Sequence, residues 1–260
     1  MLPRHRGIIF SVVARARWLP GLLLLFYPIS TSAEKTSNII TRENFSPEHR
    51  EELAIKLRKI TGWSDLRFDR GGVLRVGTRE AVGGSKSARD LVAKVIVGTN
   101  IVVLEDASKR SDIAFCRVIP GKWKHAAINA PPAFVVQIDF ADFGQILGDE
   151  RALEAFDVGW GLLHELDHIV NDSQDATNLN EAGECEEHVN QMRRECNLPQ
   201  RADYFFTFLP IVRDSAFMTR WVRLAFDQEQ SATKKKRYWL VWDAKLVGGF
   251  EESNQIAALK

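Results

Sequence analysis

The chain has 260 residues, enough for one domain of moderate size preceded by a targeting segment. Charged residues make up 27% and hydrophobic residues 45%, the proportions of a globular protein, which excludes a chain that is disordered throughout. The formal net charge of +1 gives no indication of a nucleic-acid partner, and the one basic cluster, Lys234 to Arg237, is typical of a solvated turn before a strand.

The first 33 residues have the pattern of a secretory signal peptide. Four arginines precede the apolar run LPGLLLLFYPIS, and the small residues Thr31-Ser32-Ala33 follow it. The apolar run is too short to span a bilayer comfortably. We therefore expect cleavage after Ala33 and export to the periplasm or out of the cell. The mature chain, residues 34–260, would carry a formal charge of −3 and no stable membrane span.

The patterns in residues 34–260 predict one mixed domain. In chain order they are an amphipathic helix at 47–62, a hairpin around Gly71-Gly72, a helix at 85–98, and strands at 100–107, 112–119 and 133–143. A long helical pattern at 149–171 follows, then a polar loop at 172–179, a second helix at about 179–196, and aromatic runs at 203–208 and 237–247 that indicate a closing hairpin. Strands before and after two central helices predict the α+β class.

The three cysteines, Cys116, Cys185 and Cys196, exclude a fully paired disulfide framework because their number is odd. If Cys185 and Cys196 share a helix, about 16 Å separates them, too far for a disulfide. At most, Cys116 pairs with one of them. No CxxC motif supports a thiolate zinc site.

The stretch GWGLLHELDHIVND, residues 159–172, contains two histidines one helical turn apart. On a helix, His164 and His168 lie about 40° apart on one polar stripe, and leucines occupy the opposite side. Two imidazoles in this arrangement can bind one zinc ion. HELDH is the HExxH pattern, in which Glu165 serves as general base to a metal-bound water. The alternative is that both are partly buried histidines with ordinary hydrogen-bond partners.

At these residues the chain resembles the zincin metallopeptidases, in a form typical of exported bacterial proteins. The resemblance implies a mixed sheet packed on the HExxH helix, with an edge strand that binds extended substrate; residues 133–143 are the candidate for that strand. Metzincins continue as HExxHxxGxxH, whereas Asn171 and Gln174 stand at the glycine and third histidine here. What remains resembles the gluzincins, which take a third ligand from a glutamate on a following helix.

Four side chains compete for the place of third ligand: Glu181, Glu184, Glu187 and His188. Glu187 points away from the apolar face of the second helix, and Glu181 can cap the helix start together with Asn178. Glu184 and His188 lie one turn apart at the edge of that face. We therefore predict Glu184 as the ligand with His188 as its support, although the reverse assignment is chemically sound.

Together these features predict an exported metallopeptidase with one Zn²⁺ per chain, held by His164, His168 and Glu184. Glu165 would move a proton from the attacking water to the leaving amine of a peptide or protein substrate. The rival hypothesis is a catalytically silent zincin-like domain that binds a partner or a cell-surface component. Three protein ligands favour catalysis, and four favour a structural site. The sequence indicates neither the cleavage preference nor the oligomeric state.

Overall fold

The structure is a computed structural model that describes residues 37–77, 80–108, 110–124, 129–209, 220–231 and 233–248. All of them belong to one unit, Lys35–Lys260. The segment predicted as a signal peptide, residues 1–33, lies outside the described residues.

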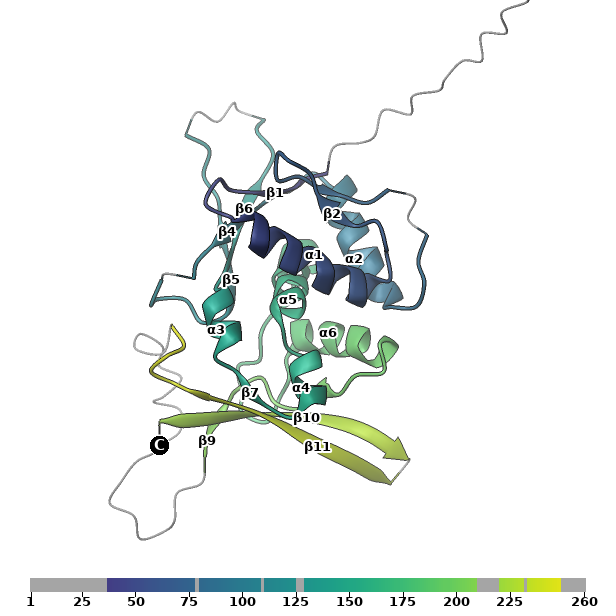
Figure 1. Cartoon of the computed structure of the whole chain (residues 1–260), viewed down its shortest axis with the longest axis vertical. Coiled ribbons are helices and arrows are strands. Elements are labelled where there is room, and N and C mark those ends of the chain that lie inside the picture. Colours follow the sequence, from purple (N-terminus) through teal and green to yellow (C-terminus); the bar gives the residue numbers. More distant parts are fainter. Residues whose placement is uncertain are drawn as a thin grey trace, which may run out of the picture. The chain divides into compact units, whose positions relative to one another are not determined.

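The first sheet is mixed, with the strand order β1-β4-β6-β5 (Figure 1). Its strands are β1 (Ile39–Thr41), β4 (Ile101–Asp106), β5 (Cys116–Pro120) and β6 (Ala133–Ile138). Strands β1, β4 and β6 run parallel, and β5 is antiparallel to β6 at the edge. The prediction that residues 133–143 form the edge strand is therefore wrong. The last four residues of β6 are buried, as expected for a strand covered on both faces.

Helix α5 (Val158–Asn171) packs against β5, β6 and three other helices. These helices are α1 (Pro47–Thr61), α2 (Lys86–Val97) and α6 (Glu184–Glu195) (Figure 1). Its side chains Trp160, Leu162, Leu163 and Leu166 are at most 1% exposed. Burial of four such side chains contributes several kcal/mol, at about 1.5–3 kcal/mol each, so α5 is held firmly at the centre of the domain.

The helical pattern predicted at 149–171 is divided between α4 (Glu150–Glu154) and α5, and the short helix α3 (Phe140–Gly144) precedes both. The division occurs because Asp157 caps α5: its carboxylate accepts hydrogen bonds from the backbone N–H groups of Gly159 and Trp160, at 2.9 and 3.3 Å. The second predicted helix also begins later than expected, at Glu184.

The second sheet is antiparallel, with the order β7-β11-β10-β8 and with β9 paired to β10. Its strands are β7 (Leu147–Gly148), β8 (Gln200–Arg201), β9 (Thr207–Phe208), β10 (Trp221–Ser231) and β11 (Lys234–Asp243). The predicted pairing of the aromatic runs 203–208 and 237–247 is wrong, because β11 pairs with β10 and β9 pairs with β10 alone. The basic cluster at Lys234 begins β11 instead of preceding a strand.

The predicted hairpin around Gly71-Gly72 is confirmed by the antiparallel pair β2 (Arg67–Phe68) and β3 (Leu74–Arg75). The α+β class is confirmed as well, since a mixed sheet and helices share one core.

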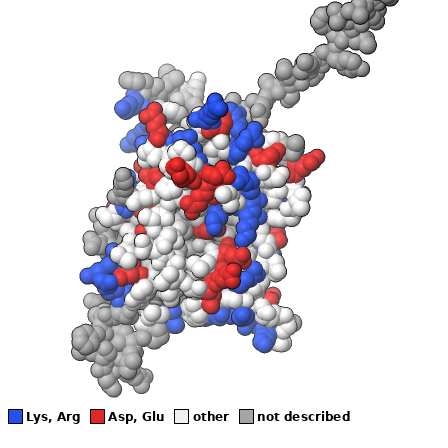
Figure 2. Space-filling view, viewed as in Figure 1, with Lys and Arg blue, Asp and Glu red and all other residues white. Residues whose placement is uncertain are grey.

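Among the described residues, no helix combines the length and the apolar character needed to cross a membrane. Acidic and basic side chains are interspersed on the face drawn in Figure 2.

Candidate metal centre

Helix α5 brings the two motif histidines into direct proximity. His164 and His168 are one turn apart, and their Nε2 atoms lie 3.2 Å from each other. His164 is 9% exposed. The backbone carbonyl of Ser173 lies 2.8 Å from His168 Nδ1 and accepts its proton, which leaves His168 Nε2 free to act as a ligand. The regular turn of α5 therefore presents two nitrogen donors to one point.

A third donor comes from the loop between α5 and α6, residues 172–183, which we call the α5–α6 loop. Asp175 Oδ1 lies 3.0 Å from His164 Nε2 and 3.5 Å from His168 Nε2. Sequence reasoning missed this residue, since it stands in a polar loop without periodicity. The available signal was a carboxylate seven positions after His168, close enough in the chain to fold back over the helix end.

Two contacts hold this loop over α5. The Ser173 hydroxyl donates to the buried carboxylate of Asp167 at 2.6 Å, and Asp175 forms a backbone bridge with Gly183. Gly183 has a φ of +82°, and a Cβ at this position would lie 2.3 Å from the backbone nitrogen of Ala176. A residue without a side chain is therefore required where the loop meets the start of α6.

Cys185 completes a group of four donors. One donor atom each from His164, His168, Asp175 and Cys185 lies within 4.8 Å of the others, so the group can hold a metal ion. The thiol of Cys185 is fully buried and donates to the backbone carbonyl of His164 at 3.3 Å. All three cysteines of the chain are free.

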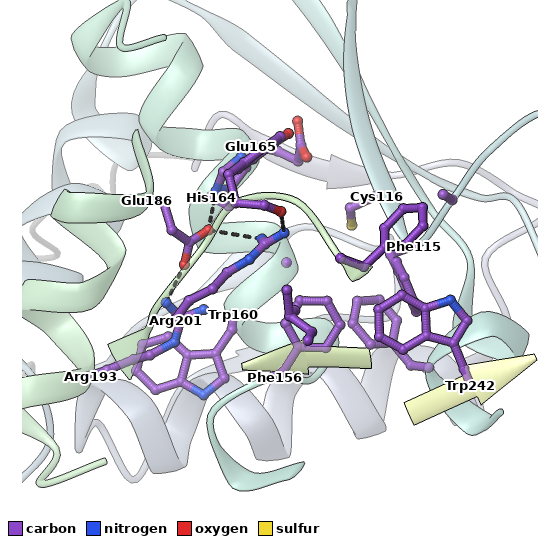
Figure 3. Close-up of a pocket in the computed structure, with 16 residues that line it drawn as sticks. Phe115, Cys116, Phe156, Trp160, His164, Glu165, Glu186, Arg193, Arg201 and Trp242 are labelled. Atoms are coloured by element: carbon purple, nitrogen blue, oxygen red, sulfur yellow. Dashed lines mark hydrogen bonds and ion pairs between the residues drawn. The ribbon is translucent and has the colours of Figure 1, made fainter. Parts of the chain in front are cut away.

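Glu186 faces Nδ1 of His164, the ring nitrogen that does not face Asp175, and Figure 3 shows it between that histidine and two arginines. Its Oε2 lies 3.3 Å from His164 Nδ1 and 3.1 Å from Arg201, and its other oxygen pairs with Arg193. The two arginines hold the pKa of the buried Glu186 well below its usual range, although burial opposes the charge. Sequence reasoning missed Glu186; its spacing of seven from Arg193 places both on one helix face.

The structure does not bring the predicted third ligand, Glu184, to the histidines. Glu184 is exposed at the first position of α6, and the donor group does not include it. His188 is also exposed and bonds Asp167 at 2.8 Å. Glu181 accepts from Asn178 at 3.1 Å, and Glu187 is exposed. The difference arises because α6 begins at Glu184, so the residues before it belong to the loop.

Glu165 is 6% exposed and lies at the wall of a cavity next to His164. Burial raises the pKa of its carboxyl, and the nearby histidines oppose that shift. The backbone N–H of Val118 on β5 donates to the same carboxylate. Glu165 is thus fixed between the histidine pair and the edge strand, in a setting suited to proton transfer.

The charges of the donor group are strongly coupled. The hydrogen bond that His168 donates to the Asp175 carboxylate raises the pKa of His168 to about 11. Burial opposes a charge on His164, but the carboxylates of Asp175 and Glu186 raise its pKa well above the usual value. Burial likewise opposes the charge on Asp175, and the two histidines nevertheless hold its pKa below the usual range. Without a metal, protons on the imidazoles balance the carboxylate.

The donor set fits a metal ion of borderline softness. Two imidazole nitrogens lie 3.2 Å apart, and a carboxylate oxygen lies within 3.5 Å of both, so the three atoms can coordinate one cation.

No protein-family model, no curated protein and no solved structure matches this chain.

Proposed function

We propose that the chain is an exported zinc-dependent metallopeptidase with a zincin-like site. The observation that carries the proposal is the convergence of His164 Nε2, His168 Nε2 and Asp175 Oδ1, at 3.0–3.5 Å from one another, beside the buried Glu165. In this proposal Asp175 takes the place of Glu184 as third ligand. The ligand set is therefore two histidines and an aspartate of the α5–α6 loop, which differs from the gluzincin arrangement.

Zinc suits these residues because it accepts nitrogen and carboxylate oxygen together in tetrahedral sites. When bound by three protein ligands, zinc lowers the pKa of a coordinated water to about 7 and polarises the carbonyl that the water attacks. The side chain of Asp175 keeps 39% of its surface exposed, so solvent and substrate can reach this side of the group.

Glu165 is the general base of the proposed reaction. Its carboxylate accepts a proton as water attacks the peptide carbonyl and returns that proton to the leaving amine. The Val118 N–H donates to this carboxylate and fixes it beside the histidine pair, so the proton travels a short, defined path. The Ser173 carbonyl accepts a hydrogen bond from Nδ1 of His168 and so orients that imidazole, and the Glu186 carboxylate lies 3.3 Å from Nδ1 of His164.

The test of this function is Glu165→Gln. Glutamine keeps the shape of the side chain but cannot accept the proton, and Glu165 is outside the donor group. The variant should bind one zinc per chain as the wild type does and lose about 10²- to 10⁴-fold in kcat/KM on a casein-like or mixed-peptide substrate. Elemental analysis and peptide hydrolysis measure the two properties. A wild-type chain that binds no zinc, or one that hydrolyses nothing in a broad peptide library, would refute the proposal.

The rival hypothesis, a zincin-like binding module with a closed metal site, is favoured by one observation: Cys185 can supply a fourth ligand. The two hypotheses differ on Cys185→Ala. In an open site the thiol only donates to the His164 carbonyl, so zinc binding and hydrolysis persist. In a closed structural site the variant loses a ligand, and zinc affinity falls by more than about 100-fold.

A further inference from the structure

A cavity of about 240 Å³ lies beside His164 and Glu165. In Figure 3 the labelled rings Phe156, Trp160 and Trp242 lie at one end of it, with His164 and Glu165 at the other. The aromatic part of its wall comes from Phe115, Phe143, Phe156, Trp160, Tyr204, Phe206 and Trp242. The mechanism described above uses only the polar end, so the aromatic end has no assigned role.

The aromatic wall is an ordered structure. Phe115 lies at its centre, with ring centroids 5.2 Å from Phe143, 5.2 Å from Phe156 and 5.4 Å from Trp242. Edge-to-face and tilted contacts at these distances are favourable. Phe115, Phe143 and Phe156 each keep part of their surface exposed. The wall is therefore preformed, and its rings retain surface that a ligand can cover.

Three charged side chains around the cavity, Glu186, Arg193 and Arg201, are already paired with one another. Glu186 forms ion pairs with Arg193 and Arg201. The guanidinium of Arg193 lies 5.3 Å from the ring centroid of Trp160, and that of Arg201 lies 4.8 Å from the ring of Tyr204. A charged ligand group entering the aromatic end would lose its water without gaining a partner, whereas an apolar group loses nothing. The wall therefore selects apolar chemistry.

The size of the cavity sets the class of group that fits. An apolar cavity of about 150 Å³ is known to hold a benzene molecule, so one of about 240 Å³ has room for a phenyl ring. The partly exposed rings of Phe115, Phe143 and Phe156 can contact such a guest, each pair contributing about 0.5–1.5 kcal/mol beyond area burial.

We propose that this cavity receives one aromatic side chain of the peptide substrate and sets the cleavage preference of the enzyme. The inference rests on the proposed function for its biological meaning, but the binding of an aromatic group can be tested without hydrolysis. His164 is the one member of the donor group that lines this cavity, together with the proposed general base Glu165, so a side chain held there places its own backbone beside these two residues.

The experiment uses the full chain with Glu165→Gln and three probes: the N-acetyl amides of phenylalanine, alanine and lysine. Binding is followed by NMR through the indole N–H signals of Trp160 and Trp242, both of which line the cavity. The phenylalanine amide should shift these signals and bind at least about tenfold more tightly than the other two. Equal binding of the three probes would overturn the inference.

Ala114→Leu supplies the matched variant, since Ala114 lines the cavity and a larger side chain there fills it. Affinity for the phenylalanine amide should fall by about tenfold or more. Ala141→Leu, the same change at an exposed position of α3 outside this cavity, should leave affinity unchanged. An Ala114→Leu variant that is folded and binds the probe normally would contradict the proposal.

A second variant covers the case in which Ala114→Leu does not fold. Phe143→Ala enlarges the cavity, so the preference should move from the phenylalanine amide to the larger naphthylalanine amide. An unchanged order of affinity would count against the cavity. These binding results also separate the two hypotheses: probe binding without any peptidase activity in the wild type retains the cavity and rejects the enzyme. Peptide hydrolysis with no preference for aromatic residues retains the enzyme and rejects the aromatic binding role of the cavity.

Discussion

Helix α5 and the α5–α6 loop supply ligands to one metal centre by different physical means. On α5, the helical repeat alone places His164 and His168 on the same stripe, with their Nε2 atoms 3.2 Å apart. In the loop, Asp175 is held at the histidines by remote contacts: Ser173 bonds Asp167, and Gly183 lets two backbones approach. A ligand on a helix follows from spacing, whereas a ligand on a loop depends on contacts with distant residues.

The largest expected effect concerns the loop ligand itself. Asp175→Asn keeps the shape of the side chain but removes the charge that faces both histidines, so zinc affinity should fall by more than about 100-fold. Glu184→Gln is the matched control on α6 and should change zinc affinity little, since Glu184 is exposed and outside the donor group. Chelator-competition titrations measure both. A greater loss at Glu184 would place the third ligand on the helix after all.

The next effect concerns the contact that fixes the loop. Asp167 is 1% exposed and accepts hydrogen bonds from Ser173 and His188, at 2.6 and 2.8 Å. Asp167→Asn should weaken zinc binding by about 10- to 100-fold, because Asp175 loses its support.

His188→Ala provides the comparison for Asp167. It removes one exposed donor and leaves the bond from Ser173 intact, so the loss should stay below about tenfold. Both variants need the unfolding midpoint of the metal-free protein as a readout of general stability. If zinc affinity and that midpoint fall in proportion for both variants, Asp167 has a structural role only.

A third prediction uses the coupling between loop and helix. Because the hydrogen bond that His168 donates to the Asp175 carboxylate raises the pKa of His168 to about 11, its imidazole is protonated at neutral pH in the metal-free protein. Zinc must displace that proton and the proton of His164, whose pKa is also raised, so apparent affinity should rise by up to about 100-fold per pH unit between pH 6 and 8. Asp175→Asn removes the cause of the shift and should flatten the slope. An identical slope in both proteins, measured by titration at constant ionic strength, would show that Asp175 and His168 are not coupled.

The smallest effect is expected far from the centre, where α6 supports the start of α2. The carboxylate of Glu195 accepts from the Ser85 hydroxyl, the Ser87 hydroxyl and the Ser87 backbone N–H, at 2.7, 2.7 and 2.9 Å. Burial opposes the charge of Glu195, but these donors lower its pKa to about 2. Glu195→Gln should cost about 1 kcal/mol or less and leave zinc affinity unchanged.

The pH dependence of this contact follows from the sign of the shift. A lowered pKa means that the stabilisation is fully present above about pH 4.5 and is lost as pH falls towards 2. The difference in unfolding midpoint between the wild type and Glu195→Gln should therefore shrink over that range. A difference that persists unchanged at pH 2 would assign the effect to shape and not to charge.

Prediction from sequence succeeded where one element contains the whole pattern. The α+β class and the β2–β3 hairpin follow from local periodicity and turn residues. It failed where partners are remote: β5 replaces β6 at the sheet edge, and β10 replaces residues 203–208 as the partner of β11. Strand order depends on which faces become buried, and local pattern does not encode that choice.

The sequence by itself determined the histidine pair, because a spacing of four on a helix fixes the direction of both side chains. The position of Glu165 beside them is determined in the same way. Only the tertiary structure decided that Asp175 faces the pair, that Glu184 is exposed, and that the buried Glu186 supports His164. These depend on where α6 begins and on how the loop crosses α5. Both are set by contacts between residues far apart in the chain, including the close backbone approach at Gly183.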